Sequence, residues 1–142
     1  MLLGVALSIV LLIHRASRPR VIEIGRVPGT SYFADLERHP ENERVRDVLV
    51  VRNEGALLYF NVDHVRDQLT ALLHARASAP GLLIFFMGNV PYVDLAGAEL
   101  LADLHATLLE QGIEFRLAET HGTVREALRR LHHPHARRAR RA

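Results

Sequence analysis

The spacing of apolar residues changes along the chain, and each change marks a predicted element. Val21 to Val27 alternates apolar and polar residues, as expected for a half-buried strand. From Asn61, from Asp94 and again from Thr123, apolar residues recur every three or four positions, as on one face of a helix. The pattern predicts strands that alternate with helices, and therefore an α/β protein with helices packed on a mixed sheet.

The stretch between the first strand and the first helix is less regular. Residues 28–47 open with Pro-Gly and hold a second proline and clustered charges, which predicts a long connection with one short helical turn around Tyr32 to Arg38. After it, Val48 to Arg52 and Ala56 to Phe60 flank Asn53-Glu54-Gly55. Two apolar runs around a turn that contains glycine predict a β-hairpin.

The next part of the chain predicts a central strand between two amphipathic helices. Leu82 to Met87 is apolar at every position, which predicts a strand covered on both faces. The helix after Asp94 is expected to end at Gly112, where a left-handed residue closes a helix, and Ile113 to Glu119 is expected to be a further strand. The buried stripes of the two helices are Val62, Val65, Leu69, Leu72 and Leu73, and then Gly97, Leu101, Leu104 and Leu108.

The first residues differ from the rest. Leu2 to Ile13 holds twelve apolar or small residues without a charge, and a membrane span needs about 20. The arginines come after this run, which excludes an ordinary secretory signal and is typical of the cytoplasmic end of a membrane helix. We expect residues 1–14 to be the end of a transmembrane helix and residues 15–20 a basic juxtamembrane linker. The alternative is a short helix that packs on the domain or drives association.

Charge narrows the class of partner. Residues 21–131 hold 11 arginines against all 16 acidic residues, so an acidic body lies between two basic ends. A nucleic-acid-binding domain normally carries its basic face on the fold itself, and this class is therefore not expected. Residues 134–142 are expected to be a disordered Arg-rich tail, attracted to anionic lipid by about 1 kcal/mol per Arg near the membrane.

Candidate chemistry is sparse. Asp94 is expected to cap the helix that follows it, a contribution of about 1 kcal/mol. The chain has no cysteine and no glycine-rich phosphate-binding loop. His105 and His121 have no nucleophile or carboxylate at a recognisable spacing, and the cluster of His132, His133 and His135 lies at the start of the tail. We expect no catalytic, cofactor or metal site.

Two stretches together resemble the STAS domain, which sulphate transporters share with anti-sigma-factor antagonists. Residues 90–131 read VPYVDLAGAELLADLHATLLEQGIEFRLAETHGTVREALRRL, directly after the apolar strand. Residues 25–69, GRVPGTSYFADLERHPENERVRDVLVVRNEGALLYFNVDHVRDQL, resemble the junction and first half of that domain in SulP anion transporters. The resemblance implies a STAS domain over residues 21–133. In SulP proteins the domain follows the final membrane helix on the cytoplasmic side, which would account for Leu2 to Ile13.

The chain departs from the antagonist branch at one point. There the aspartate is typically followed by Ser-Ser-Gly or Ser-Thr-Gly, and a partner kinase phosphorylates the first serine. Here Leu95 and Ala96 precede Gly97, and neither has a hydroxyl group. The charge switch of that branch is therefore not expected.

The resemblance implies a non-enzymatic regulatory or protein-interaction domain at the C-terminus of a SulP-type anion transporter. It would lie at the cell membrane on the cytoplasmic side. Its partners would be the transmembrane portion of the transporter and a cytoplasmic regulatory protein. The alternative is a stand-alone, membrane-tethered partner-switching module without the phosphorylatable serine. The predicted contact surface consists of Tyr92, Asp94, Leu95, Ala96 and Gly97.

Overall fold

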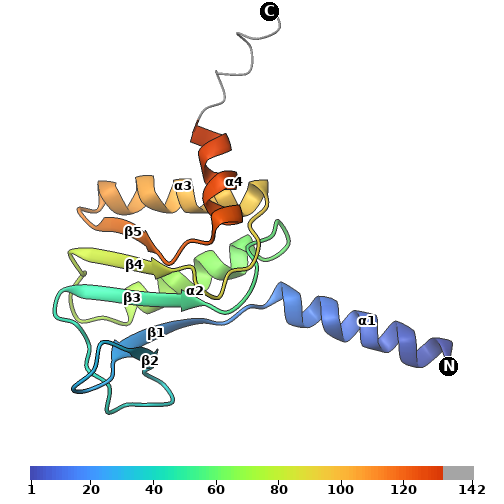
Figure 1. Cartoon of the computed structure of the whole chain (residues 1–142), viewed down its shortest axis with the longest axis horizontal. Helices are drawn as coiled ribbons and strands as arrows, with labels where there is room; N and C mark the ends of the chain where they lie inside the picture. The colour runs from blue at the N-terminus through green and yellow to red at the C-terminus, as the bar shows by residue number, and fades with distance from the viewer. Residues whose placement is uncertain (133–142) are drawn as a thin grey trace, which may run out of the picture.

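The structure is a computed structural model that describes residues 1–132. A mixed sheet of five strands lies at its centre, in the order β2-β1-β3-β4-β5 (Figure 1). β1 pairs antiparallel with both β2 and β3, while β3, β4 and β5 are mutually parallel. The strands are β1 (Val21–Arg26), β2 (Phe33–Asp35), β3 (Val48–Asn53), β4 (Leu82–Phe86) and β5 (Glu114–Ala118). The α/β fold class with a mixed sheet is confirmed.

One face of the sheet carries the main core. Helices α2 (Val62–His74) and α3 (Leu95–Glu110) pack on it through the predicted stripes, so that Val65 and Leu69 are fully buried. Gly112 has φ 75° and closes α3, as predicted. The last helix, α4 (Gly122–His132), contributes Val124 to the same core.

The other face of the sheet differs from the prediction. In β4, Leu83 and Phe85 are completely buried on the helix face, but Ile84 and Phe86 on the other face are only half-buried. The apolar cluster on that second face consists of strand residues alone: Ile22, Ile24 and Val50, with Val48, Ile84 and Phe86 around them. The prediction that β4 is covered on both sides is therefore wrong in part, because these side chains shield one another across the strands.

Two local predictions differ from the structure. No strand forms over Ala56 to Phe60, where Leu57 makes a single isolated bridge to Val93. The segment cannot pair with β3 to form the predicted hairpin, because β1 and β4 already occupy both edges of β3. The predicted helical turn around Tyr32 to Arg38 is wrong in part: β2 occupies Phe33–Asp35, but a single turn follows it, in which the N–H of His39 donates to the carbonyl oxygen of Asp35 at 2.9 Å.

The first helix, α1 (Leu2–Ser17), extends away from the body in Figure 1 and has no buried residue. No residue of α1 is buried against the domain, which contradicts the alternative that the helix packs there. The other part of that alternative, that the helix drives association, stays a prediction. Within residues 1–132, no helix combines the length and the apolar character that a membrane crossing requires.

The sheet topology brings α1 to the same edge as several loops. β1 runs antiparallel to β3 and β3 runs parallel to β4 and β5, so the amino end of β1 lies beside the carboxyl ends of these three strands. We call this the α1 edge; it comprises residues 16–20, 54–61, 87–97 and 119–122. The arrowheads of β3 and β4 point to the end from which α1 leaves (Figure 1).

Candidate functional site

The predicted contact surface lies at the α1 edge, between β4 and α3. Val90 and Val93 are buried and anchor the connection, while Tyr92 between them points outward and is 58% exposed. This connection is hydrogen-bonded to the loop of residues 54–61, which lies between β3 and α2. The N–H of Leu57 donates to the carbonyl oxygen of Tyr92 at 3.0 Å. A second bond runs in the opposite direction: the N–H of Asp94 donates to the carbonyl oxygen of Leu57 at 3.1 Å.

Asp94 has two structural roles. Its Oδ1 accepts a hydrogen bond from the N–H of Gly97 at 2.8 Å, which confirms the predicted helix cap. Its Oδ2 accepts a second hydrogen bond from the N–H of Tyr59 at 2.9 Å. This second bond joins residues 35 positions apart, so no local motif could have predicted it. The carboxylate fastens the loop of residues 54–61 to the start of α3.

Gly97 allows these two segments to approach each other. It is buried, and a Cβ atom there would lie 2.5 Å from the carbonyl oxygen of Leu57 and 2.8 Å from the Cβ of Leu57. The backbone of α3 thus packs directly on the backbone of the loop. Its neighbours Leu95 and Ala96 are exposed and partly exposed.

Asn61 is a structural residue that the sequence analysis missed. Its side chain is almost completely buried, with a residue exposure of 2%. The Nδ2 atom donates to the carbonyl oxygens of Ala16 and Ala56, each at 3.0 Å, and Oδ1 accepts from the N–H of Leu58 at 3.0 Å. The only sequence signal was an Asn just before a helix, which is typical of an N-cap. Its side chain instead ties the loop to the last turn of α1.

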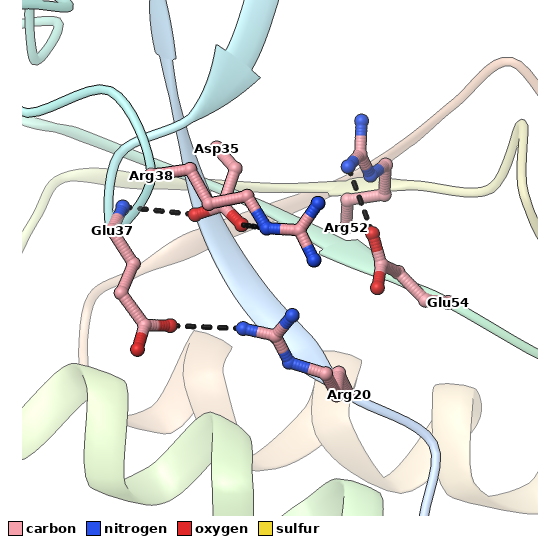
Figure 2. A network of polar contacts seen from close by, with 6 residues as sticks. All are labelled: Arg20, Asp35, Glu37, Arg38, Arg52 and Glu54. Atoms are coloured by element: carbon pink, nitrogen blue, oxygen red, sulfur yellow. Dashed lines mark hydrogen bonds and ion pairs between the residues drawn. The ribbon is translucent and has the colours of Figure 1, made fainter.

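One ion pair and one backbone hydrogen bond attach the linker to the domain. Arg20 lies 2.9 Å from Glu37, and Arg52 lies 2.9 Å from Glu54 (Figure 2). The N–H of Glu54 also donates to the carbonyl oxygen of Arg20 at 2.9 Å. Exposed ion pairs contribute little stability, but these contacts direct Arg20 toward the domain. Arg15 and Arg18 are exposed and make no ion pair within residues 1–132.

Four exposed side chains gather on this part of the α1 edge. Tyr59 is 74% exposed, Tyr92 58%, Leu95 60% and Phe60 42%. The rings of Tyr59 and Phe60 stand edge to face, with centroids 5.4 Å apart. We call these four residues the aromatic patch. Tyr92 and Leu95 belong to the contact surface predicted from the sequence. Tyr59 and Phe60 do not, because the sequence pattern predicts a strand over Ala56 to Phe60.

His121 and His105 make contacts within the described part of the chain. The Nε2 atom of His121 lies 2.8 Å from the carbonyl oxygen of Gly88 and links two loops of the α1 edge. His105 is exposed on α3 beside the ring of Phe115. Residues 1–132 contain no group of three potential metal ligands. The cluster of His132, His133 and His135 extends beyond the described residues.

Replacing Asp94 with alanine is expected to lower the free energy of unfolding by about 2 kcal/mol, because two backbone N–H groups lose their acceptor. The cap alone would account for about 1 kcal/mol. Asp94→Asn retains one acceptor oxygen and is the matched control, with an expected loss of about half as much. Chemical denaturation measures both. Equal stability of Asp94→Ala and the unaltered chain would contradict the assignment.

The mixed sheet, the capped α3 and its contact with the loop define a known class of domain. A family model described as the STAS domain matches residues 39–136, which is more than half of the chain. The chain belongs to the STAS domain family.

The curated relatives that match are sulfate transporters. The chain is 30% identical over 126 residues to sulfate transporter 1.2 of Arabidopsis thaliana, covering 83% of this chain and 19% of the relative. It is 31% identical over 131 residues to a probable sulfate transporter of Mycobacterium tuberculosis, covering 90% of this chain and 23% of the relative. The chain therefore spans about a fifth of the length of the curated relatives it matches.

Solved structures support the same fold. Murine Slc26a9, an anion transporter in the inward-facing state, matches with a TM-score of 0.80 and 24% identity, over 89% of this chain and 20% of that one. The STAS domain of a SulP transporter from Vibrio cholerae matches with a TM-score of 0.52 and 20% identity, over 67% of this chain and 71% of that one. At these identities the likeness concerns the fold.

Proposed function

We propose that this chain is the non-enzymatic, cytoplasmic regulatory domain of an anion transporter of the sulfate-transporter kind. In this proposal α1 is the last part of the membrane helix that precedes the domain. One observation carries the proposal: α1 is apolar from Leu2 to Ile13, has no buried residue, and leads through residues 18–20 into β1 of the sheet. An apolar helix that the domain itself does not cover needs another apolar environment.

The domain would act through contacts. Tyr92, Asp94, Leu95, Ala96 and Gly97 lie at the edge from which α1 leaves, so this surface would face the membrane side, where the transmembrane portion of the transporter and the surrounding lipid lie. Leu95 would offer an apolar contact at the position where the antagonist branch carries a phosphorylated serine. A cytoplasmic regulatory partner would bind at surfaces farther from α1.

The alternative of a stand-alone partner-switching module fits less well. Leu95 and Ala96 provide no hydroxyl group for a kinase, so the module would lack its switch. The DNA upstream of Met1 separates the two functions. A continuous upstream reading frame with many hydrophobic segments supports the transporter domain, and a neighbouring kinase gene without such a frame supports the module.

The arginines of residues 134–142, which lie outside the described structure, would add electrostatic attraction to anionic lipid.

Membrane attachment is tested by flotation with vesicles of phosphatidylcholine and phosphatidylglycerol. The full chain is expected to float with the vesicles, whereas a chain that lacks residues 1–17 is expected to stay in the aqueous fraction. This deletion retains the buried Pro19 and the Arg20–Glu37 pair. In a matched control, Leu7→Asp with Leu11→Asp keeps the full length but places two charges on α1, and flotation should again be lost.

Circular dichroism should show folded STAS domains in all three chains. Flotation of the shortened chain to the same extent as the full chain would contradict the role of α1.

A further inference from the structure

We propose that the aromatic patch lies in the lipid headgroup layer of the membrane that receives α1. This inference rests on the proposed insertion of α1 and adds a second membrane contact, made by the domain itself. Tyr59, Phe60, Tyr92 and Leu95 would form this contact.

The contact between α1 and the loop of residues 54–61 sets the depth of the aromatic patch. The loop of residues 54–61 touches the last turn of α1, because Asn61 Nδ2 donates to the carbonyl oxygen of Ala16 at 3.0 Å. One helical turn rises about 5.4 Å, and the headgroup layer on each side of a bilayer is about 5–7 Å thick. With Leu2 to Ile13 in the hydrocarbon, the turn that contains His14 and Arg15 lies among the headgroups. The loop that is bonded to this turn then lies at nearly the same depth.

The two segments that carry the aromatic patch are held in a fixed orientation to each other. The loop is fixed to the start of α3 by the hydrogen bond from the N–H of Tyr59 to Asp94 Oδ2 at 2.9 Å. Tyr59 and Phe60 on the loop therefore share one edge with Tyr92 and Leu95 on the β4–α3 connection. All four side chains are exposed at this edge.

The side chains of the aromatic patch suit the membrane–water interface. A single exposed aromatic residue needs no explanation, but four large apolar or amphipathic side chains at one edge form a potential contact surface. Tyrosine prefers the membrane–water interface, because its ring is apolar and its hydroxyl group remains hydrated. Arg15, which is exposed and lines a pocket with residues of the loop 54–61, matches the negative charge of anionic headgroups. Asp94 is the carboxylate within the patch, and both of its oxygens already accept backbone hydrogen bonds.

These observations favour lipid over a protein partner. The depth follows from the contact with α1, and the side chains are those of an interfacial aromatic belt. A contact with protein remains an alternative outcome of the test.

The absence of tryptophan from the chain permits a direct test. Single tryptophan reporters are introduced as Tyr59→Trp and Tyr92→Trp in the full chain, bound to phosphatidylcholine–phosphatidylglycerol vesicles with acyl chains brominated near the headgroup. Leu7→Trp reports insertion of α1. Tyr32→Trp is the matched control, because Tyr32 is 75% exposed and follows the carboxyl end of β1, opposite the α1 edge.

The expected result is a blue shift and strong quenching by brominated lipid for Tyr59→Trp and Tyr92→Trp, with little change for Tyr32→Trp. Thermal melting in solution verifies that each variant folds. If Leu7→Trp is quenched while the two patch reporters behave like Tyr32→Trp, the headgroup contact is overturned and the insertion of α1 stands. Protection of the patch reporters from both aqueous acrylamide and brominated lipid indicates a protein contact and also overturns the inference. If Leu7→Trp is not quenched, the proposed membrane attachment fails, and this inference fails with it.

Discussion

Replacing Asn61 with alanine is expected to lower the free energy of unfolding by about 3 kcal/mol. The substitution leaves the carbonyl oxygens of Ala16 and Ala56 and the N–H of Leu58 without their partner in a site where Asn61 is only 2% exposed. A buried polar group without a partner costs about 1–3 kcal/mol. The loss of unfolding free energy stays below the sum of three such costs, because water can reach the end of α1 and replace part of the lost hydrogen bonding.

The measurement is urea denaturation of the full chain, followed by circular dichroism. Asn89→Ala is the matched control, because Asn89 is exposed at the same edge, and the expected change is within about 0.5 kcal/mol. Hydrogen exchange adds a local readout, since the N–H of Leu58 should exchange faster in Asn61→Ala. Equal stability of the two variants would mean that Asn61 does not hold α1 and the loop together.

Replacing Gly97 with alanine is expected to lower the free energy of unfolding by about 2 kcal/mol, although alanine favours a helix by about 1 kcal/mol over glycine. The added methyl group would lie 2.5 Å from the carbonyl oxygen of Leu57. That oxygen accepts the hydrogen bond from the N–H of Asp94, so the loop cannot retreat without losing the bond.

Gly122→Ala is the matched control. A Cβ atom at Gly122, at the start of α4, meets no atom within 4 Å, so the same change should leave stability unchanged or raise it slightly. Thermal melting of both variants decides between two roles of Gly97. A glycine that served only to let a ligand approach the helix would tolerate the methyl group, and Gly97→Ala would then melt like the unaltered chain.

The candidate site could be predicted only in part. Asp94 as a helix cap and Leu95 as an exposed apolar residue follow from local order, and the structure agrees with both. The bond from Tyr59 to Asp94 and the anchoring of α1 by Asn61 could not be predicted, because each joins residues at least 35 positions apart. The contact role of the surface stays a proposal.

The sequence by itself determined the elements whose signal is local. The helix-period stripes, the cap at Asp94 and the glycine at the end of α3 are decided within a few residues, because helical hydrogen bonds join neighbours in the chain. Only the tertiary structure decided which edges the strands share. Ala56 to Phe60 is apolar enough for a strand, but β1 and β4 already occupy both edges of β3. The segment therefore crosses the α1 edge and carries Tyr59 and Phe60 to the site, since strand pairing depends on competition between distant segments that no local pattern records.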